Sequence, residues 1–406
     1  MDIILKRYLK SITYGTENFP IVALIGPRQV GKTTSLKLFA KNKRVYDLER
    51  DSDFDFIVND PEFFLSNLKV PIFIDEAQLS DKLFRALRVF IDKNRKLNFQ
   101  IMISGSSSPE LLSNISETLA GRVTINEIFP FTLGEIEKTE SSTIYEIFKS
   151  GDSKKLTLLS IKKRNWTHSL WWGGYPEPVL KNDLQFKNIW CENYIQSYID
   201  RDIRRLFPDL NIAAYKTFIK LLANSSGEII NFASWASVVG VSEPTIKNYL
   251  RIAEGTFLFR TLPAFAFHTQ KRLTKAPKGQ MKDTGLLCAL LRIESPEDLI
   301  GHPRSGFIFE SFCIEQLLKS FKIEMIQVEY SHYRTKEHNE IDLILEFSKF
   351  KIPVEIKLGC EVRTENLKVL AHFIKEHNCP FGVIINNSEE VLELKPGIFQ
   401  IPFGCL

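Results

Sequence analysis

The sequence has no closely paired cysteines. Its six cysteines are scattered, and no two of them form a CxxC pair. This scattered pattern, without a paired CxxC spacing, argues against a zinc site and against a disulfide framework. The cysteine pattern therefore favours a protein of the reducing cytoplasm.

Long apolar runs are also missing. No stretch approaches the roughly 18 apolar residues of a membrane span, and the apolar part of MDIILKRYLKS is too short for a secretory signal. The charge is nearly balanced, since 53 Lys and Arg face 49 Asp and Glu, and a net charge of +4 decides neither for nor against nucleic acid as a partner. We expect a soluble protein with no membrane partner, on which any basic surface is local.

The pattern of the sequence changes along its 406 residues, without internal repeats or low-complexity tracts. A chain of this length can bury two or three cores. Up to about Pro130, runs of nearly consecutive apolar residues alternate with helical patterns, which is typical of strands buried on both faces of a parallel sheet. These runs are IVALIG, RVYDLE, IFIDEA, FQIMISG and VTINEIFP. Residues 1–130 are therefore expected to form an α/β domain.

Three later segments differ from the first. Residues 131–212 have a helical pattern interrupted by a Gly-Gly-Tyr-Pro turn. Residues 213–282 contain a compact helical set, and the run FLFRTLPAFAF within them predicts strand. Residues 283–406 change from helix to strands, among them EIDLILEF, KIPVEIKLG and FGVIIN. We expect domain boundaries near residues 130, 212 and 282.

A glycine-rich loop follows the first apolar run. Residues 26–33, GPRQVGKT, fit the pattern GxxxxGK[ST] between a predicted strand and a predicted helix. Gly26 and Gly31 permit backbone angles that aim amides at phosphates, and the N-terminus of the helix adds partial positive charge. Lys32 is expected to reach the terminal phosphates, and the Thr33 hydroxyl to bind magnesium. The predicted nucleotide contacts in this phosphate loop are Gly26, Pro27, Arg28, Gln29, Val30, Gly31, Lys32, Thr33 and Thr34.

Acidic residues follow the apolar run at residues 71–74. Because ligands lie at the carboxyl ends of strands in such sheets, Asp75 is expected to hold the metal and Glu76 to orient and deprotonate the attacking water. Ser104, at the end of the next apolar run, is a candidate contact of the terminal phosphate or the water. A solvated strand end and an ordinary Ser/Gly turn would also explain these letters.

Arg122 immediately precedes the run at 123–128. A guanidinium at a sheet edge can reach the transferring phosphate of a neighbouring subunit and stabilise charge in the transition state, which predicts a catalytic role in a homo-oligomer. A surface arginine remains the alternative.

These motifs together carry a resemblance. The stretches GPRQVGKTT, IFIDEAQ, ISGSSS, LAGRV and EIFPFTLGEI resemble the bacterial and archaeal AAA-type ATPases whose C-terminal half is a domain of unknown function. The resemblance implies ATP rather than GTP, and the sequence has no guanine-specific NKxD motif. It also implies an additional-strand sheet, in which the second, acidic strand is not adjacent to its predecessor in sequence. In related ATPases a GxP turn of a helical lid touches adenine, so Pro176 is a candidate base contact, although such turns are also ordinary helix connections.

Residues 228–267 have the spacing of a helix-turn-helix. Gly240 ends one helix, and Ser242 caps the next, with Pro244 in its first turn. The apolar positions Ile246, Tyr249, Leu250 and Ala253 share one face of the second helix. The predicted DNA contacts on its exposed side are Thr245, Lys247, Asn248 and Arg251.

The segment after this helix completes a predicted winged helix. FLFRTLPAFAF is expected to supply a wing-like strand pair. Basic residues that suit phosphates follow it, namely His268, Lys271, Arg272, Lys275 and Lys278. Winged helices also serve as protein-protein modules, so DNA binding and protein binding both stay open.

A last set of charged residues lies near the C-terminus. Glu310 falls in a helical pattern, Asp342 near the start of a strand, and Glu355 and Lys357 alternate along another strand and so face the same way. Carboxylates that converge on magnesium beside a lysine suit phosphodiester hydrolysis. The pattern resembles the PD-(D/E)xK nuclease core, which implies an α/β restriction-endonuclease-like domain. An ordinary ion pair and an inactive binding platform are the alternatives.

Two functions are consistent with these motifs. In one, a magnesium-dependent ATPase acts on DNA or is regulated by it, and the last domain cuts or grips the DNA. In the other, ATP controls a protein-protein assembly, and the nuclease-like domain is inert.

Overall fold

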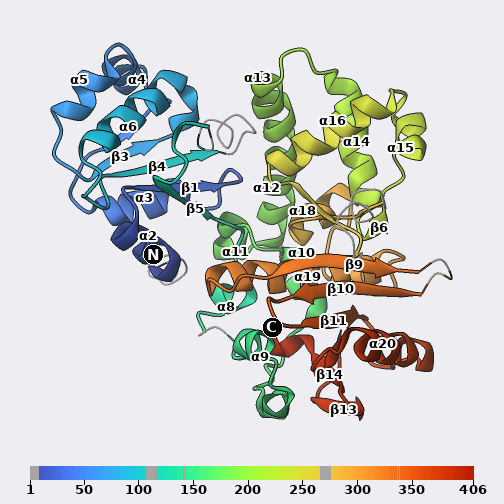
Figure 1. Cartoon of the computed structure of the whole chain (residues 1–406). Helices are drawn as coiled ribbons and strands as arrows, with labels where there is room; N and C mark the ends of the chain where they lie inside the picture. Colours follow the sequence, from blue (N-terminus) through green and yellow to red (C-terminus); the bar gives the residue numbers. More distant parts are fainter. Residues whose placement is uncertain are drawn as a thin grey trace. The chain divides into compact units, whose positions relative to one another are not determined.

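The computed structural model describes residues 9–106, 115, 117–139, 142–265, 276–335, 337 and 339–406. The chain forms two compact units (Figure 1). The first comprises residues up to Pro130 together with Gly255–Leu258, and the second comprises Phe131–Glu254 and Phe259–Leu406. Each unit has its own sheets and its own buried side chains, and each is described separately below.

The first unit alternates helices with parallel strands. Its helices are α2 (Leu9–Asn18), α3 (Lys32–Ala40), α4 (Asp51–Val58), α5 (Pro61–Ser66) and α6 (Asp81–Lys93). Its strands are β1 (Ile21–Gly26), β2 (Val45–Asp47), β3 (Ile72–Asp75), β4 (Ile101–Ser106) and β5 (Val123–Glu127). Every residue of β1 and β3 is buried, as expected for strands covered on both faces.

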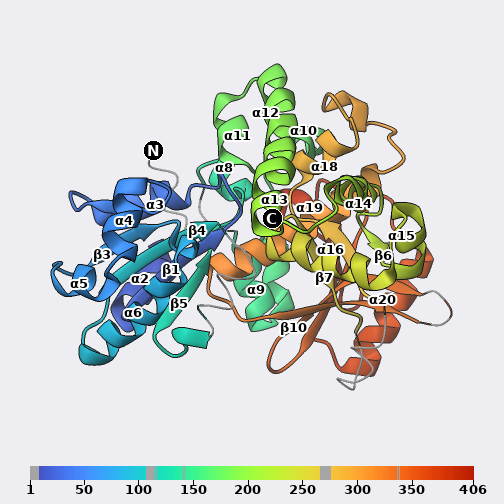
Figure 2. The ribbon, with the colours of Figure 1, turned by 90° about the horizontal axis from the view of Figure 1, so that it is seen from above.

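Helices cover both faces of this five-stranded sheet. The Ile21, Ala23 and Ile25 side chains share one core with Leu83 and Leu87 of α6. Helices α2 and α3 pack on β1 and lie on the opposite side of the sheet from α6 (Figures 1 and 2). The alternation of side chains along β1 therefore serves two separate helical layers.

The strand order is β2-β3-β4-β1-β5. Strand β4 lies between β1 and the acidic strand β3, with Ile101 paired to both Ile21 and Ile72. The acidic strand does pair with β2, the strand before it in sequence, so the expected separation from its predecessor is wrong. The strand from which it is separated is β1, which leads into the phosphate loop.

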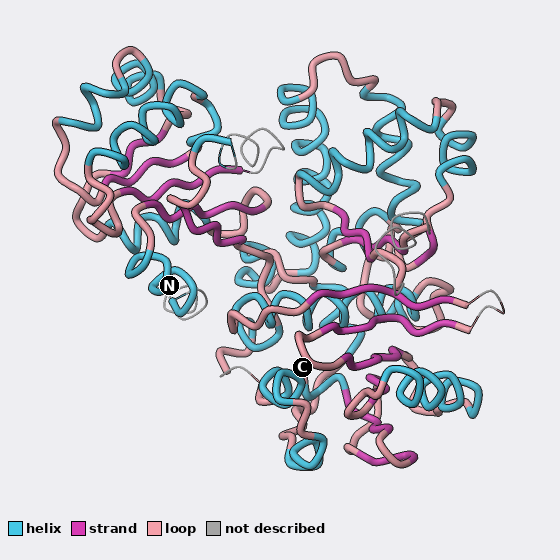
Figure 3. The backbone as a smooth tube through the Cα atoms, viewed as in Figure 1, coloured by secondary structure: helices cyan, strands magenta, loops and turns pink. Residues whose placement is uncertain are grey.

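The second unit begins with helices. Within the described residues, no strand lies between Phe131 and Asn224 (Figure 3). A π-helical stretch at Tyr198–Ile203 continues α12 into α13. The helices of this segment are α8 (Leu133–Ile136), α9 (Ile144–Ser150), α10 (Trp166–Trp172), α11 (Pro176–Lys181), α12 (Leu184–Ser197), α13 (Arg204–Leu206) and α14 (Ile212–Asn224).

Two helices and a small sheet come next. Helix α15 (Phe232–Val239) ends at Gly240, whose φ is +76°, and α16 (Glu243–Gly255) follows. Strands β6 (Glu228–Ile229), β8 (Lys278–Met281) and β7 (Phe259–Leu262) form a sheet in the order β6-β8-β7. In its described residues, 257–265, FLFRTLPAFAF supplies the single strand β7 rather than the predicted pair, and β7 pairs with β8, which lies further along the chain.

The C-terminal part contains a mixed sheet of order β13-β14-β12-β11-β10-β9. Its strands are β9 (Glu329–Arg334), β10 (Glu340–Glu346), β11 (Lys351–Ile356), β12 (Gly382–Asn386), β13 (Leu392–Lys395) and β14 (Ile398–Pro402). Helices α18 (Thr284–Leu290) and α19 (Ser305–Ile323) precede it, and α20 (Thr364–His377) packs on four of its strands. A parallel α/β sheet followed by a separate C-terminal sheet confirms the predicted α/β class.

Candidate functional site

The phosphate loop joins β1 to α3. Gly26 and Gly31 have φ of +150° and +97°, and Gln29 also has a positive φ of +60°. A Cβ built on Gly26 would lie 2.2 Å from the backbone oxygen of Ile128, so no side chain fits there. The loop thus depends on glycine at its start for a close approach of two backbone segments.

Lys32 begins helix α3 with its side chain buried. Its Nζ donates to the backbone oxygens of Gly26, at 3.0 Å, and of Pro27, at 2.7 Å. The ammonium is therefore held within the loop, against the carbonyls at its start.

The other predicted loop residues surround this lysine in sequence. Val30 and Pro27 are buried, whereas Gln29 is exposed. An Arg28 nitrogen lies 3.7 Å from a Glu49 carboxylate oxygen. Thr33 and Thr34 are half-buried in the first turn of α3.

Asp75 and Ser104 meet at the carboxyl ends of neighbouring strands. The Ser104 hydroxyl donates to Asp75 Oδ1, and the same oxygen accepts from the Glu76 backbone N–H at 3.1 Å. Both side chains are almost fully buried. In the described part of the chain these hydrogen bonds go to Oδ1, which leaves Oδ2 for a ligand. Ser104 thus orients the carboxylate that was predicted to hold the metal.

Glu76 adopts the left-handed backbone conformation, with φ of +53°. Its half-buried carboxylate accepts a hydrogen bond from the Gln78 amide. Gln78 was not among the predicted site residues, although it stands in the quoted stretch IFIDEAQ. The sequence did offer a signal for Gln78. A glutamine two residues after Glu76 has a side-chain amide that can hold the Glu76 carboxylate in position, even though the Glu76 backbone is strained.

Arg122 lies just before β5, an edge strand of the sheet. Its Nε and Nη2 donate to the two carboxylate oxygens of Asp92, at 2.8 and 2.9 Å, and its Nη1 donates to the Ala120 backbone oxygen. The side-chain hydrogen bond from Arg122 lowers the pKa of Asp92. Asp92, on α6, was not predicted, because thirty residues separate the two partners.

Pro176 belongs to the second unit, in which it is buried at the first position of α11. The turn before it is fixed by two hydrogen bonds. The Gly174 backbone N–H donates to Asp283 Oδ2 at 2.8 Å, and the Gly174 oxygen accepts from the Phe131 backbone N–H at 2.6 Å. A contact between Pro176 and a base stays a prediction.

Helix α16 has one apolar and one polar side. The predicted inward face is confirmed, since Ile246, Tyr249, Leu250 and Ala253 are all buried. Among the predicted DNA contacts, Thr245 is half-buried and Lys247, Asn248 and Arg251 are exposed. Lys247 lies over the Phe232 ring of α15, with Nζ 5.3 Å from the ring centroid.

The basic residues that were predicted to bind phosphates after α16 lie partly outside the described residues. His268, Lys271, Arg272 and Lys275 lie outside the described residues. Lys278 lies on β8, and its place as an accessible phosphate contact is wrong because its side chain is buried against acids.

The four predicted nuclease-like residues do come together. Lys357 Nζ lies 3.3 Å from Asp342 Oδ2 and 2.8 Å from Glu355 Oε1. Lys278 Nζ lies 3.2 Å from Asp342 Oδ1 and also pairs with Glu310. Positive and negative groups therefore alternate through this cluster, which we call the charge cluster and which consists of Lys278, Glu310, Asp342, Glu355 and Lys357. All of its members except the partly exposed Lys357 are buried.

Protonation in the charge cluster follows from burial and from the ion pairs. Burial and the nearby Asp342 charge raise the pKa of Glu310 and of Glu355. Burial alone would raise the pKa of Asp342 too, but Lys278 and Lys357 outweigh it and hold that pKa below its usual value. For the two lysines the acids outweigh burial and raise the pKa of each ammonium. Asp342 is thus the charged centre of the cluster.

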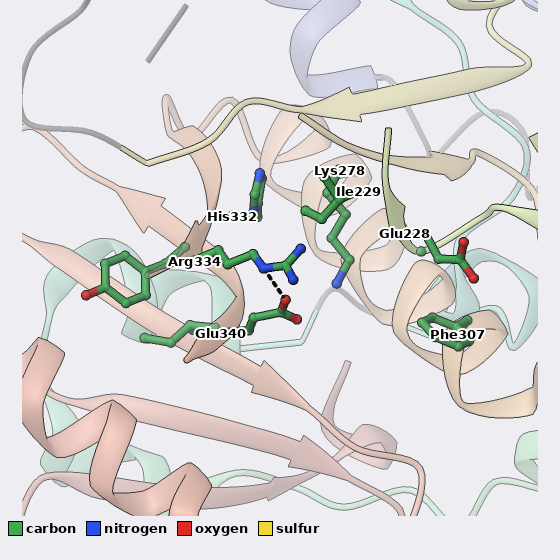
Figure 4. Close-up of a pocket in the computed structure, with 10 residues that line it drawn as sticks. Glu228, Ile229, Lys278, Phe307, His332, Arg334 and Glu340 are labelled. Carbon is green, nitrogen blue, oxygen red and sulfur yellow. Dashed lines mark ion pairs between the residues drawn. The ribbon is translucent and has the colours of Figure 1, made fainter. Parts of the chain in front are cut away.

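A pocket of about 320 Å³ opens beside the charge cluster (Figure 4). Its lining includes Lys278, Phe307 and His332, together with an ion pair between Arg334 Nε and Glu340 Oε1 at 2.9 Å. The pocket brings solvent to the lysine end of the cluster. Sequence reasoning missed it, because it is built from the small sheet, α19 and the C-terminal sheet.

Three parts of the chain match known domain families. Residues 18–137 match an AAA domain, residues 163–297 a domain of unknown function (DUF8612), and residues 305–406 a domain of unknown function (DUF4143). The uncharacterized protein Rv2008c of Mycobacterium tuberculosis is 30% identical over 340 residues, which are 83% of this chain and 70% of that protein. The chain belongs to the same family as Rv2008c. In this family member, the AAA domain match contains the phosphate loop, Asp75 at the end of β3 and Glu76 just after it.

More distant relatives are found as well. The uncharacterized protein MJ1544 of Methanocaldococcus jannaschii is 26% identical over 204 residues, 49% of this chain and 44% of that protein. The structure of a Walker-type ATPase of Pyrococcus abyssi covers 71% of this chain and 95% of its own, with 15% identity and a TM-score of 0.44.

The AAA domain match and the loop geometry identify the activity of the first unit. This family member is a P-loop ATPase that binds ATP. Among the described residues, none of the helices combines the length and the apolar character needed to cross a bilayer.

Proposed function

We propose that the chain is a magnesium-dependent cytoplasmic ATPase whose cycle acts on DNA or is regulated by DNA. The observation that carries the hydrolytic part is the contact between Asp75 and Ser104. It lies at the carboxyl edge of the sheet, where β4 separates the acidic strand from the strand of the phosphate loop. Ligands of parallel α/β sheets bind at this edge.

The residues at this edge fit a magnesium ion and a triphosphate. Thr33 offers a hydroxyl in the first turn of α3, and Asp75 offers Oδ2, which are the oxygen ligands that magnesium prefers. Bound magnesium would neutralise charge on the phosphates. Lys32 supplies positive charge from within the loop, where its ammonium is already placed.

Glu76 is proposed to act on the attacking water. It orients the water and accepts its proton, while Gln78 holds its carboxylate. Arg122 is proposed to stabilise the transferring phosphate of a neighbouring copy in a homo-oligomer, for which its bonds to Asp92 must open. Pro176 is proposed as the adenine contact.

The hydrolytic proposal is tested by Glu76→Gln. This variant should bind ATP as wild type does, but its turnover should fall at least about 100-fold, because a positioned general base contributes about 10² to 10⁴ in rate. Steady-state phosphate release measures turnover, and calorimetry measures binding. Glu62→Gln, at an exposed position on α5, is the matched control and should behave as wild type. Wild-type turnover in Glu76→Gln with equal ATP binding would refute the role.

The DNA proposal depends on the two faces of α16. Its apolar side is fully used in packing, which leaves Lys247, Asn248 and Arg251 exposed together on the other side. A helix of a helix-turn-helix that presents such a face suits the major groove, and the small sheet beyond it would serve as the wing. The exposed cations would contribute a salt-dependent attraction to phosphates.

Duplex DNA should therefore stimulate ATP hydrolysis. In an equilibrium binding assay, Arg251→Ala should weaken DNA binding and reduce the dependence of log K on log salt by about one. Lys220→Ala, at an exposed lysine of α14, is the matched control and should keep both the affinity and the slope. Hydrolysis that ignores DNA, together with an unchanged salt dependence in Arg251→Ala, would contradict the proposal.

A second function is favoured by the charge cluster. Its three carboxylates are already paired with two lysines, so the nuclease-like domain suits an inactive platform, with ATP controlling a protein-protein assembly. In that case DNA leaves ATP turnover unchanged, and plasmid nicking in magnesium or manganese is absent. An ATP-dependent change in sedimentation without DNA would favour this second function.

A further inference from the structure

Lys278 reaches the charge cluster from a separate part of the fold. It lies on β8, the middle strand of the small sheet, in which all four residues are buried. Its ammonium meets Glu310 on α19 and Asp342 on β10. One side chain therefore links three elements, and it does so while almost fully buried.

Asp342 has both oxygens engaged in this arrangement. Oδ1 accepts from Lys278, and Oδ2 accepts from the Ile356 backbone N–H at 2.9 Å and from Lys357 at 3.3 Å. A divalent ion between Asp342 and Glu310 would need the position that the Lys278 ammonium fills. The divalent ion would also bring two positive charges close to the ammonium groups of Lys278 and Lys357. Repulsion between these like charges costs free energy in a buried site.

The remaining carboxylate is only partly engaged. Glu355 Oε1 accepts from Lys357 and from the Asn366 amide at 2.6 Å, whereas its buried Oε2 has no hydrogen-bond partner in the described part of the chain. No group of three or more His, Cys, Asp or Glu side chains among the described residues is arranged to hold a metal ion. The charge cluster does contain three carboxylates, but the Lys278 ammonium is paired with two of them, Glu310 and Asp342.

We infer that Lys278 is the resident cation of the charge cluster, that it excludes divalent ions from it, and that its removal creates a site for magnesium or manganese. The ligands of this new site would be Glu310, Asp342 and Glu355, which are hard oxygen donors suited to these ions. The side chain of Lys278 borders the pocket of about 320 Å³ (Figure 4), so an ion can reach the vacated position from solvent.

Manganese titration of the full chain without nucleotide tests this inference. Free manganese is followed by its electron paramagnetic resonance signal, in wild type and in Lys278→Met. Methionine has an unbranched apolar side chain only one heavy atom shorter than that of lysine. Wild type should show no binding that depends on Asp342, so Asp342→Asn should leave its titration curve unchanged. Lys278→Met should gain one site at least about 10-fold tighter than any site of wild type.

A second readout and two further variants support the manganese titration. In Lys278→Met the unfolding temperature should fall without metal and recover as manganese is added. The double variant Lys278→Met/Asp342→Asn should lose this recovery. Lys282→Met, a buried lysine just beyond β8, is the control for loss of a buried charge and should gain no manganese site.

Two results would overturn the inference. The first is a manganese site in wild type that is lost in Asp342→Asn. This comparison needs only wild type and Asp342→Asn, so it holds even if the Lys278 variants do not fold. The second is a folded Lys278→Met that binds no manganese. Lys278→Gln, which keeps a polar end, gives a second chance of a folded protein and has the same expected gain.

Discussion

Gly26→Ala is the substitution for which the structure gives the most specific expectation. The new Cβ would lie 2.2 Å from the Ile128 oxygen, about 1.2 Å closer than the 3.4 Å at which ordinary contact begins. The neighbour cannot turn away, because it is backbone and the Ile128 N–H is bonded to the Ile25 oxygen at 2.7 Å. Overpacking of this kind costs about 1 to 3 kcal/mol, and the positive φ of +150° adds about 1 to 3 kcal/mol.

Gly121→Ala separates these two contributions. Gly121 also has a positive φ, +71°, but a Cβ there meets nothing within 4 Å, so only the backbone strain of about 1 kcal/mol applies. Gly26→Ala should therefore be destabilised more than Gly121→Ala by about 1 to 5 kcal/mol.

Two assays measure this difference. Amide hydrogen exchange over β1 and α3 reports local opening, and calorimetry reports ATP affinity. Gly26→Ala should exchange at least about 5-fold faster than Gly121→Ala in this segment, since 1 kcal/mol is a factor of about five, and should bind ATP correspondingly more weakly. All five tryptophans lie in the second unit, so their fluorescence should stay native and exclude global unfolding. Equal exchange and equal ATP affinity in the two variants would refute the steric reasoning.

Two further predictions follow from buried and paired cations. Arg122→Ala should slow ATP hydrolysis at least about 10-fold under conditions in which copies associate, whereas Asp92→Ala, which only releases that arginine, should not. Lys187 is fully buried over the Trp171 ring, and burial lowers its pKa, so folding releases protons and stability should rise with pH toward the ordinary lysine value. The free energy of unfolding, measured by urea titration at pH 7 to 10, should rise with pH less steeply in Lys187→Met than in wild type. The same rise in both proteins would contradict this prediction.

The phosphate loop and the acidic strand were predictable because each is a continuous stretch. Gly26, Lys32 and Asp75 stand at fixed offsets from apolar runs, and strand and helix patterns place them at one edge of a parallel sheet. Glu355 in β11 and Lys357 just beyond its end likewise lie on one side by simple alternation, and they form an ion pair.

What the sequence did not reveal depends on pairing between distant segments. Lys278 joins Glu310 and Asp342 only because β8 enters the small sheet beside α19, and strand order is set by packing that no local pattern records. For the same reason β7 was expected to pair within its own segment. A cation that stands among the acids changes a predicted metal site into a set of ion pairs.

Calorimetric titration of the non-hydrolysing variant Glu76→Gln with magnesium and ATP tests the central claim most directly. The account predicts one ATP per chain, with binding weakened at least about 10-fold when Lys32→Ala is added, because that side chain carries the positive charge held within the loop. Absence of any binding heat at millimolar ATP, or equal affinity with and without Lys32, would contradict it.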